Sequence, residues 1–287
     1  LFKLHNILGL DLSHWLLNHR ERIMDKILFL PANGFPKRCY QPLIKELETQ
    51  NTVLALDYWK DFTSDKLTSW WTFIPPIIDA IHQQNEPVIL VGHSIGATLA
   101  ITCALKHKTN IKGVLAIDPA FFLPRHYIPM KILNFMRLIQ YVHPMIKASR
   151  YKKTFFNTKA EIFNRYRSKQ PFAKIRDVHL KELINGSWEP MKQGGYQLKF
   201  PKQLELDIYA TTGDLDAYIW KHISGLDIPV KCLQADQSNT FFPKTAEALK
   251  RGDNVTVSVI PDATHLFPFE QPTSIASELE IFKTQIN

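Results

Sequence analysis

The chain has 287 residues, of which 45% are hydrophobic and 22% charged, enough to bury the core of one domain with or without an insertion. This composition excludes a disordered protein. No apolar stretch reaches the roughly 18 uninterrupted residues of a membrane span. The first residues lack the basic, apolar and small-residue segments of a secretory signal, so we expect a soluble protein in the cytoplasm.

The positive charge of the chain is local. The formal net charge is +8, but residues 125–176 hold thirteen Lys or Arg residues and a single acid, Glu161, a net +12. Such a local excess indicates one basic surface and not a nucleic-acid-binding fold, so we expect no nucleic-acid partner. Cys39, Cys103 and Cys232 are too few and too widely spaced for a disulfide framework or a zinc site, and we interpret them as buried thiols.

The first half of the chain alternates between strand and helix patterns after an N-terminal hairpin at residues 2–8 and 10–17. The almost continuous apolar run at residues 26–31 is typical of a strand buried on both faces. Further strands are expected at 52–57, 87–92 and 111–118, with helical stretches at 36–50, 67–84 and 95–108 between them.

The pattern changes after residue 119. Residues 121–206 contain helical patches, such as 130–142 and 160–167, but no apolar run typical of a central strand. The alternation resumes with strands at 229–235 and 254–260 and helices at 244–251 and 273–286. The sequence therefore predicts an α/β fold with a mostly parallel central sheet flanked by helices, built from residues 1–120 and 207–287, with 121–206 as an inserted helical lid.

A motif that carries chemistry lies between the strand 87–92 and the helix that starts at residue 95. Gly92, His93, Ser94, Ile95 and Gly96 match G-x-S-x-G. A sharp strand-to-helix turn strains the backbone at the serine and places its hydroxyl above the carboxyl edge of the sheet. The amides at the start of the helix favour negative charge that develops beside it. The motif predicts a nucleophilic serine.

With this motif in this context, the chain resembles the α/β-hydrolase family over nearly its whole length. The family usually has a His-Gly-x turn after its third strand, and residues 31–36 (PANGFP) stand at that place. Asn33 replaces the usual histidine, whereas Gly34 is kept. The resemblance implies that the backbone amides of Phe35 and Ile95 form the oxyanion hole.

A serine hydroxyl needs an imidazole within hydrogen-bond reach to take its proton. Residues 261–268, after the last strand, look like the histidine loop of the family, which makes His265 the expected base. His93 is adjacent to Ser94 and would point away from it. The other histidines considered lie in the predicted lid: His126, His143 and His179.

The acid of the predicted triad has two candidates. In the commonest family pattern it follows the strand 229–235, but Ser238 stands at that position. The haloalkane dehalogenases of the same superfamily can place it after the strand that follows the nucleophile helix, where this chain has Asp118. We therefore predict a triad of Ser94, His265 and Asp118, with Asp236 as the alternative acid.

These residues predict a serine hydrolase that cleaves an ester-like bond of a small, partly apolar substrate through an acyl-enzyme, without a cofactor or a metal. Thioester, lactone or carbon–carbon bond hydrolysis would use the same residues. The alternative of another class is a non-catalytic binding or interaction protein on a hydrolase scaffold. The residues expected to line the substrate pocket are Asn33, Gly34, His93, Phe121, Phe122 and Leu266.

The predicted lid mixes cations with aromatic residues, and three interpretations of this surface stay open. The first is a solvated surface without a partner. The second is a cover for an acyl or aromatic substrate that carries an anionic group, and the third is a peripheral contact with an anionic membrane.

Overall fold

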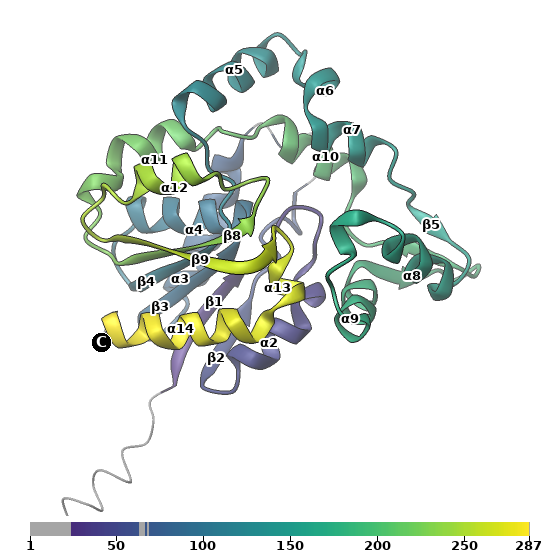
Figure 1. The fold of residues 1–287 in the computed structure, drawn as a ribbon, viewed down its shortest axis with the longest axis horizontal. Coiled ribbons are helices and arrows are strands. Elements are labelled where there is room, and N and C mark those ends of the chain that lie inside the picture. The colour runs from purple at the N-terminus through teal and green to yellow at the C-terminus, as the bar shows by residue number, and fades with distance from the viewer. Residues whose placement is uncertain (1–23, 63–66, 68, 287) are drawn as a thin grey trace, which may run out of the picture.

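The structure is a computed structural model that describes residues 24–62, 67 and 69–286 (Figure 1). The hairpin predicted at residues 2–17 lies outside the described residues.

A six-stranded sheet forms the centre of the described fold (Figure 1). Its order is β2-β1-β3-β4-β8-β9, and every neighbouring pair in it is parallel. The strands are β1 (Asp25–Leu30), β2 (Asn51–Ala55), β3 (Val88–His93), β4 (Ile111–Ile117), β8 (Val230–Gln237) and β9 (Val255–Thr264). The α/β fold with a mostly parallel central sheet is therefore confirmed.

Both faces of this sheet are covered, as the continuous apolar strands predict. Successive residues of a strand point to opposite faces. In β1, Leu28 and Leu30 belong to one buried cluster, whereas Ile27 and Phe29 belong to the other. The helices around the sheet are α2 (Gln41–Leu47), α3 (Ile74–His82), α4 (Ile95–Lys106), α12 (Pro243–Leu249), α13 (Phe267–Glu270) and α14 (Pro272–Ile286).

Prolines shorten two of the predicted helices. The helical stretch 36–50 divides into a 3-10 helix, η1 (Lys37–Tyr40), and α2, which has Pro42 in its first turn. The stretch 67–84 likewise divides into η3 (Trp70–Phe73) and α3, which has Pro75 and Pro76 in its first turn. Proline has no N–H to donate and is best tolerated in the first turn of a helix, so each of these two α-helices begins one residue before its first proline.

A long segment connects β4 to β8 and contains the predicted insertion, residues 121–206. Its helical elements are α5 (Pro124–Phe135), α6 (Ile139–Val142), α7 (Pro144–Arg150), α8 (Lys159–Arg167), η4 (Gln170–Phe172), α9 (Asp177–Ser187), α10 (Lys202–Ala210), α11 (Asp216–His222) and η5 (Ile223–Gly225). Leu180, Leu183 and Ile184 of α9 share a buried cluster with β1 and α2. The division into a core and a lid stays a prediction.

Two features of the insertion differ from the sequence interpretation. The helical patch predicted at 130–142 is two helices, α5 and α6, because Arg137 has a left-handed backbone with φ of 58°. A three-stranded antiparallel sheet, in the order β5-β7-β6, was not predicted. Its strands are β5 (Phe155–Phe156), β6 (Trp188–Pro190) and β7 (Tyr196–Leu198), which are too short to show a two-residue period.

Two glycines let α4 approach the sheet closely. A Cβ atom on Gly92 would lie 2.3 Å from the carbonyl oxygen of Gly96, and one on Gly96 would lie 2.2 Å from that of Leu30. Both neighbours are backbone atoms that cannot rotate away. The turn from β3 into α4 therefore requires glycine at both positions.

We predict that Gly96→Ala lowers the free energy of unfolding by about 2–3 kcal/mol, because the added methyl group overlaps the backbone of β1. Gly225→Ala is the matched control, since a Cβ atom there meets nothing within 4 Å. It should change stability by no more than about 1 kcal/mol. Urea unfolding of the two variants and the wild type measures both effects, and equal stabilities would contradict the packing argument.

Candidate active site

Ser94 lies in the turn between β3 and α4 with a strained backbone, at φ of 56° and ψ of −120°. Left-handed φ values are costly for a residue with a side chain and persist only where the surroundings hold them. The Ser94 amide donates to the carbonyl oxygen of Ile117 at 2.9 Å, which ties the turn to the end of β4. The side chain is partly exposed. This geometry is the one that the G-x-S-x-G motif predicts.

His265 lies directly after β9 and contacts Ser94. Its Nε2 atom is 3.1 Å from Ser94 Oγ, and its side chain is 21% exposed. Glu270 holds the last residue of β9 by accepting hydrogen bonds from the amide and the hydroxyl of Thr264. The other ring nitrogen of His265, Nδ1, lies 2.6 Å from Asp118 Oδ2.

Asp118 follows β4 and is fully buried. Besides His265, the Ser238 hydroxyl donates to its Oδ2 at 2.5 Å, and the Ala235 amide donates to its Oδ1 at 3.0 Å. Three hydrogen-bond partners thus converge on this buried carboxyl group. The structure brings together Ser94, His265 and Asp118.

Asp236, the alternative acid, has another environment. Its carboxylate is exposed and accepts hydrogen bonds from the amides of Asp262 and Ala263, both at 2.9 Å. These two hydrogen bonds lower the pKa of Asp236 below its usual value. The carboxylate therefore supports the end of β9, just before His265, and the structure gives it no hydrogen bond to the imidazole.

The two predicted oxyanion donors differ in their present partners. Ile95 is the first residue of α4, where amides have no carbonyl group within the helix to bind. The Phe35 amide, in contrast, donates to the carbonyl oxygen of Ala32 at 3.2 Å. The role of the Phe35 amide as an oxyanion donor stays a prediction, and it requires this turn to open. The Ile95 amide lies beside Ser94 at the start of α4.

Residues of the insertion cover the Asn33-Gly34 turn. The Asn33 side-chain amide donates to the carbonyl oxygen of Glu205, and Gly34, at φ of 80°, faces the Glu205 carboxylate. That carboxylate is buried and accepts hydrogen bonds from Ser149 and Lys152, each at 2.8 Å. Asn33 and Gly34 therefore contact α10, and Asn33 is itself buried.

His93 points away from Ser94, as expected from the sequence, and its place in the pocket stays a prediction. Its ring is fully buried, with Nδ1 at 2.8 Å from the Tyr40 hydroxyl and Nε2 at 2.9 Å from the carbonyl oxygen of His265. The residue before the nucleophile thus points into the core, where it links the histidine loop to η1.

Phe121 and Phe122 differ in their surroundings. Phe121 is fully buried and stacks on Trp220 with ring centroids 4.7 Å apart, so its place in the pocket stays a prediction. Phe122 is partly exposed, and its backbone is held by the Asp216 carboxylate and the Trp220 indole. Leu266 is 8% exposed, next to His265.

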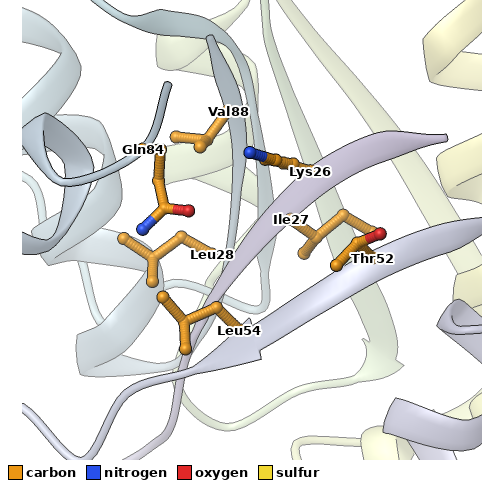
Figure 2. Close-up of a pocket in the computed structure, with 7 residues that line it drawn as sticks. All are labelled: Lys26, Ile27, Leu28, Thr52, Leu54, Gln84 and Val88. Carbon is orange, nitrogen blue, oxygen red and sulfur yellow. The ribbon is translucent and has the colours of Figure 1, made fainter. Parts of the chain in front are cut away.

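An open hollow of about 470 Å³ adjoins this segment. It is mostly apolar and lined by Phe122, Arg125, His126, Pro129, Met130 and Phe242. A second cavity, of about 50 Å³, lies near the amino ends of β1, β2 and β3 (Figure 2). It is much smaller than an ordinary ligand pocket, and Ser94 lies at the opposite end of these strands.

Four residues that support the site were not predicted in these roles: Tyr40, Glu205, Ser238 and Glu270. Ser238 had a signal in the sequence, because it occupies the position of the usual acid. The other three belong to no motif and come close only through the fold. Among the residues that the structure describes, no three His, Cys, Asp or Glu side chains gather where a metal ion could bind.

The buried ring of His93 makes stability depend on pH. Burial, together with the neighbouring His265, keeps the pKa of His93 well below its usual value. In the unfolded chain this ring takes up a proton below about pH 6.5. The free energy of unfolding therefore keeps its full value above that pH and decreases as the pH falls below it.

We predict that the wild type loses about 1.4 kcal/mol more unfolding free energy than His93→Gln between about pH 7.5 and about pH 5.5. His107 and His143, whose pKa values are also lowered by burial, are present in both proteins and cancel. Urea unfolding at the two pH values measures the difference. Equal losses would show that His93 does not resist protonation.

Comparison with known proteins shows the family of this chain. The model of the alpha/beta hydrolase family matches residues 27–278. The fold is similar to E-2-(acetamidomethylene)succinate hydrolase, with a TM-score of 0.72, 17% identity and 91% of each chain covered. It is also similar to the thioesterase domain from the curacin biosynthetic pathway, with a TM-score of 0.68, 16% identity and coverage of 91% of this chain and 92% of that one.

An esterase of M. tuberculosis gives a TM-score of 0.68 at 14% identity, with 91% of this chain and 86% of that one covered. The comparison with curated proteins finds no match. Among the described residues, no helix is both long and apolar enough to cross a bilayer. The family match spans most of the chain and includes the serine, the histidine and both candidate acids. The chain belongs to the alpha/beta hydrolase family.

Proposed function

We propose that the protein is a serine hydrolase that cleaves an ester-like bond of a small, partly apolar substrate through an acyl-enzyme. One observation carries this proposal: a continuous hydrogen-bonded path from Asp118 through His265 to Ser94, with steps of 2.6 Å and 3.1 Å. The nucleophile, the base and the group that orients the base are then within reach of one another.

In this mechanism, His265 Nε2 takes the proton of Ser94 as the serine oxygen attacks the substrate carbonyl carbon. The oxygen of that carbonyl becomes negative and accepts a hydrogen bond from the Ile95 amide, at the start of α4. When the tetrahedral intermediate collapses, the protonated His265 gives its proton to the leaving group. Asp118 fixes the tautomer of the imidazole and stabilises its protonated form.

The second half of the reaction removes the acyl group. His265 takes a proton from a water molecule, which attacks the carbonyl carbon bound to Ser94. As this second intermediate collapses, the protonated His265 returns its proton to the Ser94 oxygen, which restores the hydroxyl and releases the carboxylic acid. The same residues would cleave a thioester, a lactone or a carbon–carbon bond, so a substrate screen should include all of these.

The apolar hollow beside Phe122 is lined by none of the three triad residues, so it would take an acyl or aromatic group that extends away from Ser94. Phe122, Met130 and Phe242 offer it apolar contacts, and Arg125 at the same hollow suits an anionic group. The alternative, a binding protein on a hydrolase scaffold, is favoured by Asn33 in the place of histidine and by the Phe35 amide, which already donates to Ala32. Activity that depends on Ser94 distinguishes the two.

We predict that Asp118→Asn lowers kcat for short acyl esters by a factor on the order of 10³–10⁴, because the amide no longer fixes the imidazole or stabilises its charge. Asp236→Asn should retain most of the activity, because Asp236 accepts hydrogen bonds from amides near the end of β9 and not from the imidazole of His265. Hydrolysis of p-nitrophenyl acetate and butyrate measures both, with Ser94→Ala as the inactive reference.

Thermal unfolding of both variants shows whether they fold like the wild type. A large loss of kcat in Asp236→Asn, with Asp118→Asn still active, would contradict the assignment of Asp118 as the triad acid.

A further inference from the structure

The helices that follow Asp118 present apolar side chains to the outside. Among the described residues, 16 large hydrophobic side chains are exposed, and nine of them lie between residues 128 and 151. We call this the α5–α7 surface; its members are Ile128, Ile132, Phe135, Met136, Leu138, Tyr141, Val142, Met145 and Tyr151. Such a concentration differs from the scattered apolar residues of an ordinary solvated surface.

The helical period gathers part of this surface on one face of α5. Ile128, Ile132 and Phe135 follow one another at spacings of four and three residues, and they are 47%, 54% and 90% exposed. A different face of the same helix packs inward through the buried side chain of Tyr127, which lies against Gly213. The exposed face is therefore an addition to the apolar contacts that hold α5 in place.

The chain segment that forms the α5–α7 surface contributes positive charge and no acidic residue of its own. No Asp or Glu occurs between Asp118 and Glu161. Five exposed cations lie in or beside the surface: Arg125, Lys131, Arg137, Lys147 and Lys153. None of the five forms an ion pair with a described acid.

Exposed apolar side chains among unpaired cations fit one kind of partner. We propose that the α5–α7 surface docks on an anionic phospholipid bilayer, with its apolar side chains in the headgroup region and its cations on lipid phosphates and carboxylates. The three helices follow one another along the top of Figure 1, on the opposite side of the fold from α14. A bilayer there would meet them without contact with α14.

Two other partners fit this surface less well. A second copy of the chain, docked through the same face, would bring like charges together. Nucleic acid would bind the cations and stack on aromatic rings, but it would leave the aliphatic side chains of Ile128, Ile132 and Met136 without a partner.

Sedimentation with vesicles tests the proposal on the full chain. Wild type should bind phosphatidylcholine vesicles that contain about 30% phosphatidylserine at least about tenfold more tightly than vesicles of phosphatidylcholine alone at about 0.05 M NaCl. Binding should weaken at about 0.5 M NaCl, because salt screens the lipid charge.

Two double variants separate the apolar from the charged contribution. Ile132→Ser with Phe135→Ser, and Lys131→Glu with Lys147→Glu, should each weaken binding at least about tenfold. Their controls are Val259→Ser with Ile281→Ser, which are 57% and 50% exposed on β9 and α14, and Lys221→Glu with Lys244→Glu. Both controls should bind like the wild type, and thermal unfolding checks that all four variants fold.

A second measurement locates the contact. The natural cysteines, Cys39, Cys103 and Cys232, are buried, so an exposed cysteine can be labelled selectively. A fluorophore at Phe135→Cys should be quenched by lipids with brominated chains, and one at Ile281→Cys should not.

Four results would overturn the proposal. These are no binding of wild type to the anionic vesicles at low salt, equal losses in the variants and their controls, binding that survives the apolar double variant, and no quenching at Phe135→Cys. A dimer in analytical ultracentrifugation that Ile132→Ser with Phe135→Ser abolishes would assign the surface to a second copy instead.

Discussion

The rest of the site depends on the hydrogen bonds that the buried carboxylate of Asp118 makes. A fully buried charge costs several kcal/mol unless hydrogen bonds replace its water. Here the donors are the Ala235 amide, the Ser238 hydroxyl and His265 Nδ1, which come from the end of β8, the loop after it and the loop after β9. The carboxylate at the end of β4 therefore holds three separate segments of the chain in one place.

The two glycines on either side of Ser94 position the nucleophile, as Asp118 positions the histidine. Gly92 and Gly96 let the helix approach β3 and β1 until their backbones are in contact, which leaves Ser94 in a strained conformation above the sheet. Asp118 has a left-handed backbone as well, at φ of 43°. Both strained residues lie at the carboxyl ends of neighbouring parallel strands, so their side chains can meet one histidine.

The sequence was sufficient for the features that have a pattern of their own. The alternation of apolar strands and helices predicts the parallel sheet, and the G-x-S-x-G motif predicts the turn at Ser94. The structure also brings Asp118 to His265, and the clue was the serine at position 238. That serine donates to Asp118 in the structure. An acid there would place a second negative charge beside the carboxylate.

Features without a local pattern could not be predicted. The partner of the Phe35 amide depends on the geometry of its turn, and the buried position of His93 depends on Tyr40, 53 residues away. The short strands β5, β6 and β7 leave no period in the sequence. Charge alone also left three interpretations of the insertion open, and the exposure of Ile132 and Phe135 favours the membrane contact that we propose.

The central claim is that Ser94 is an activated nucleophile, and covalent labelling by a fluorophosphonate tests it without any assumption about the substrate. We predict that intact-mass analysis finds one adduct on the wild type and none on Ser94→Ala, because the proposed mechanism activates Ser94 through His265. No adduct on folded wild type, or an equal adduct on Ser94→Ala, would contradict the account.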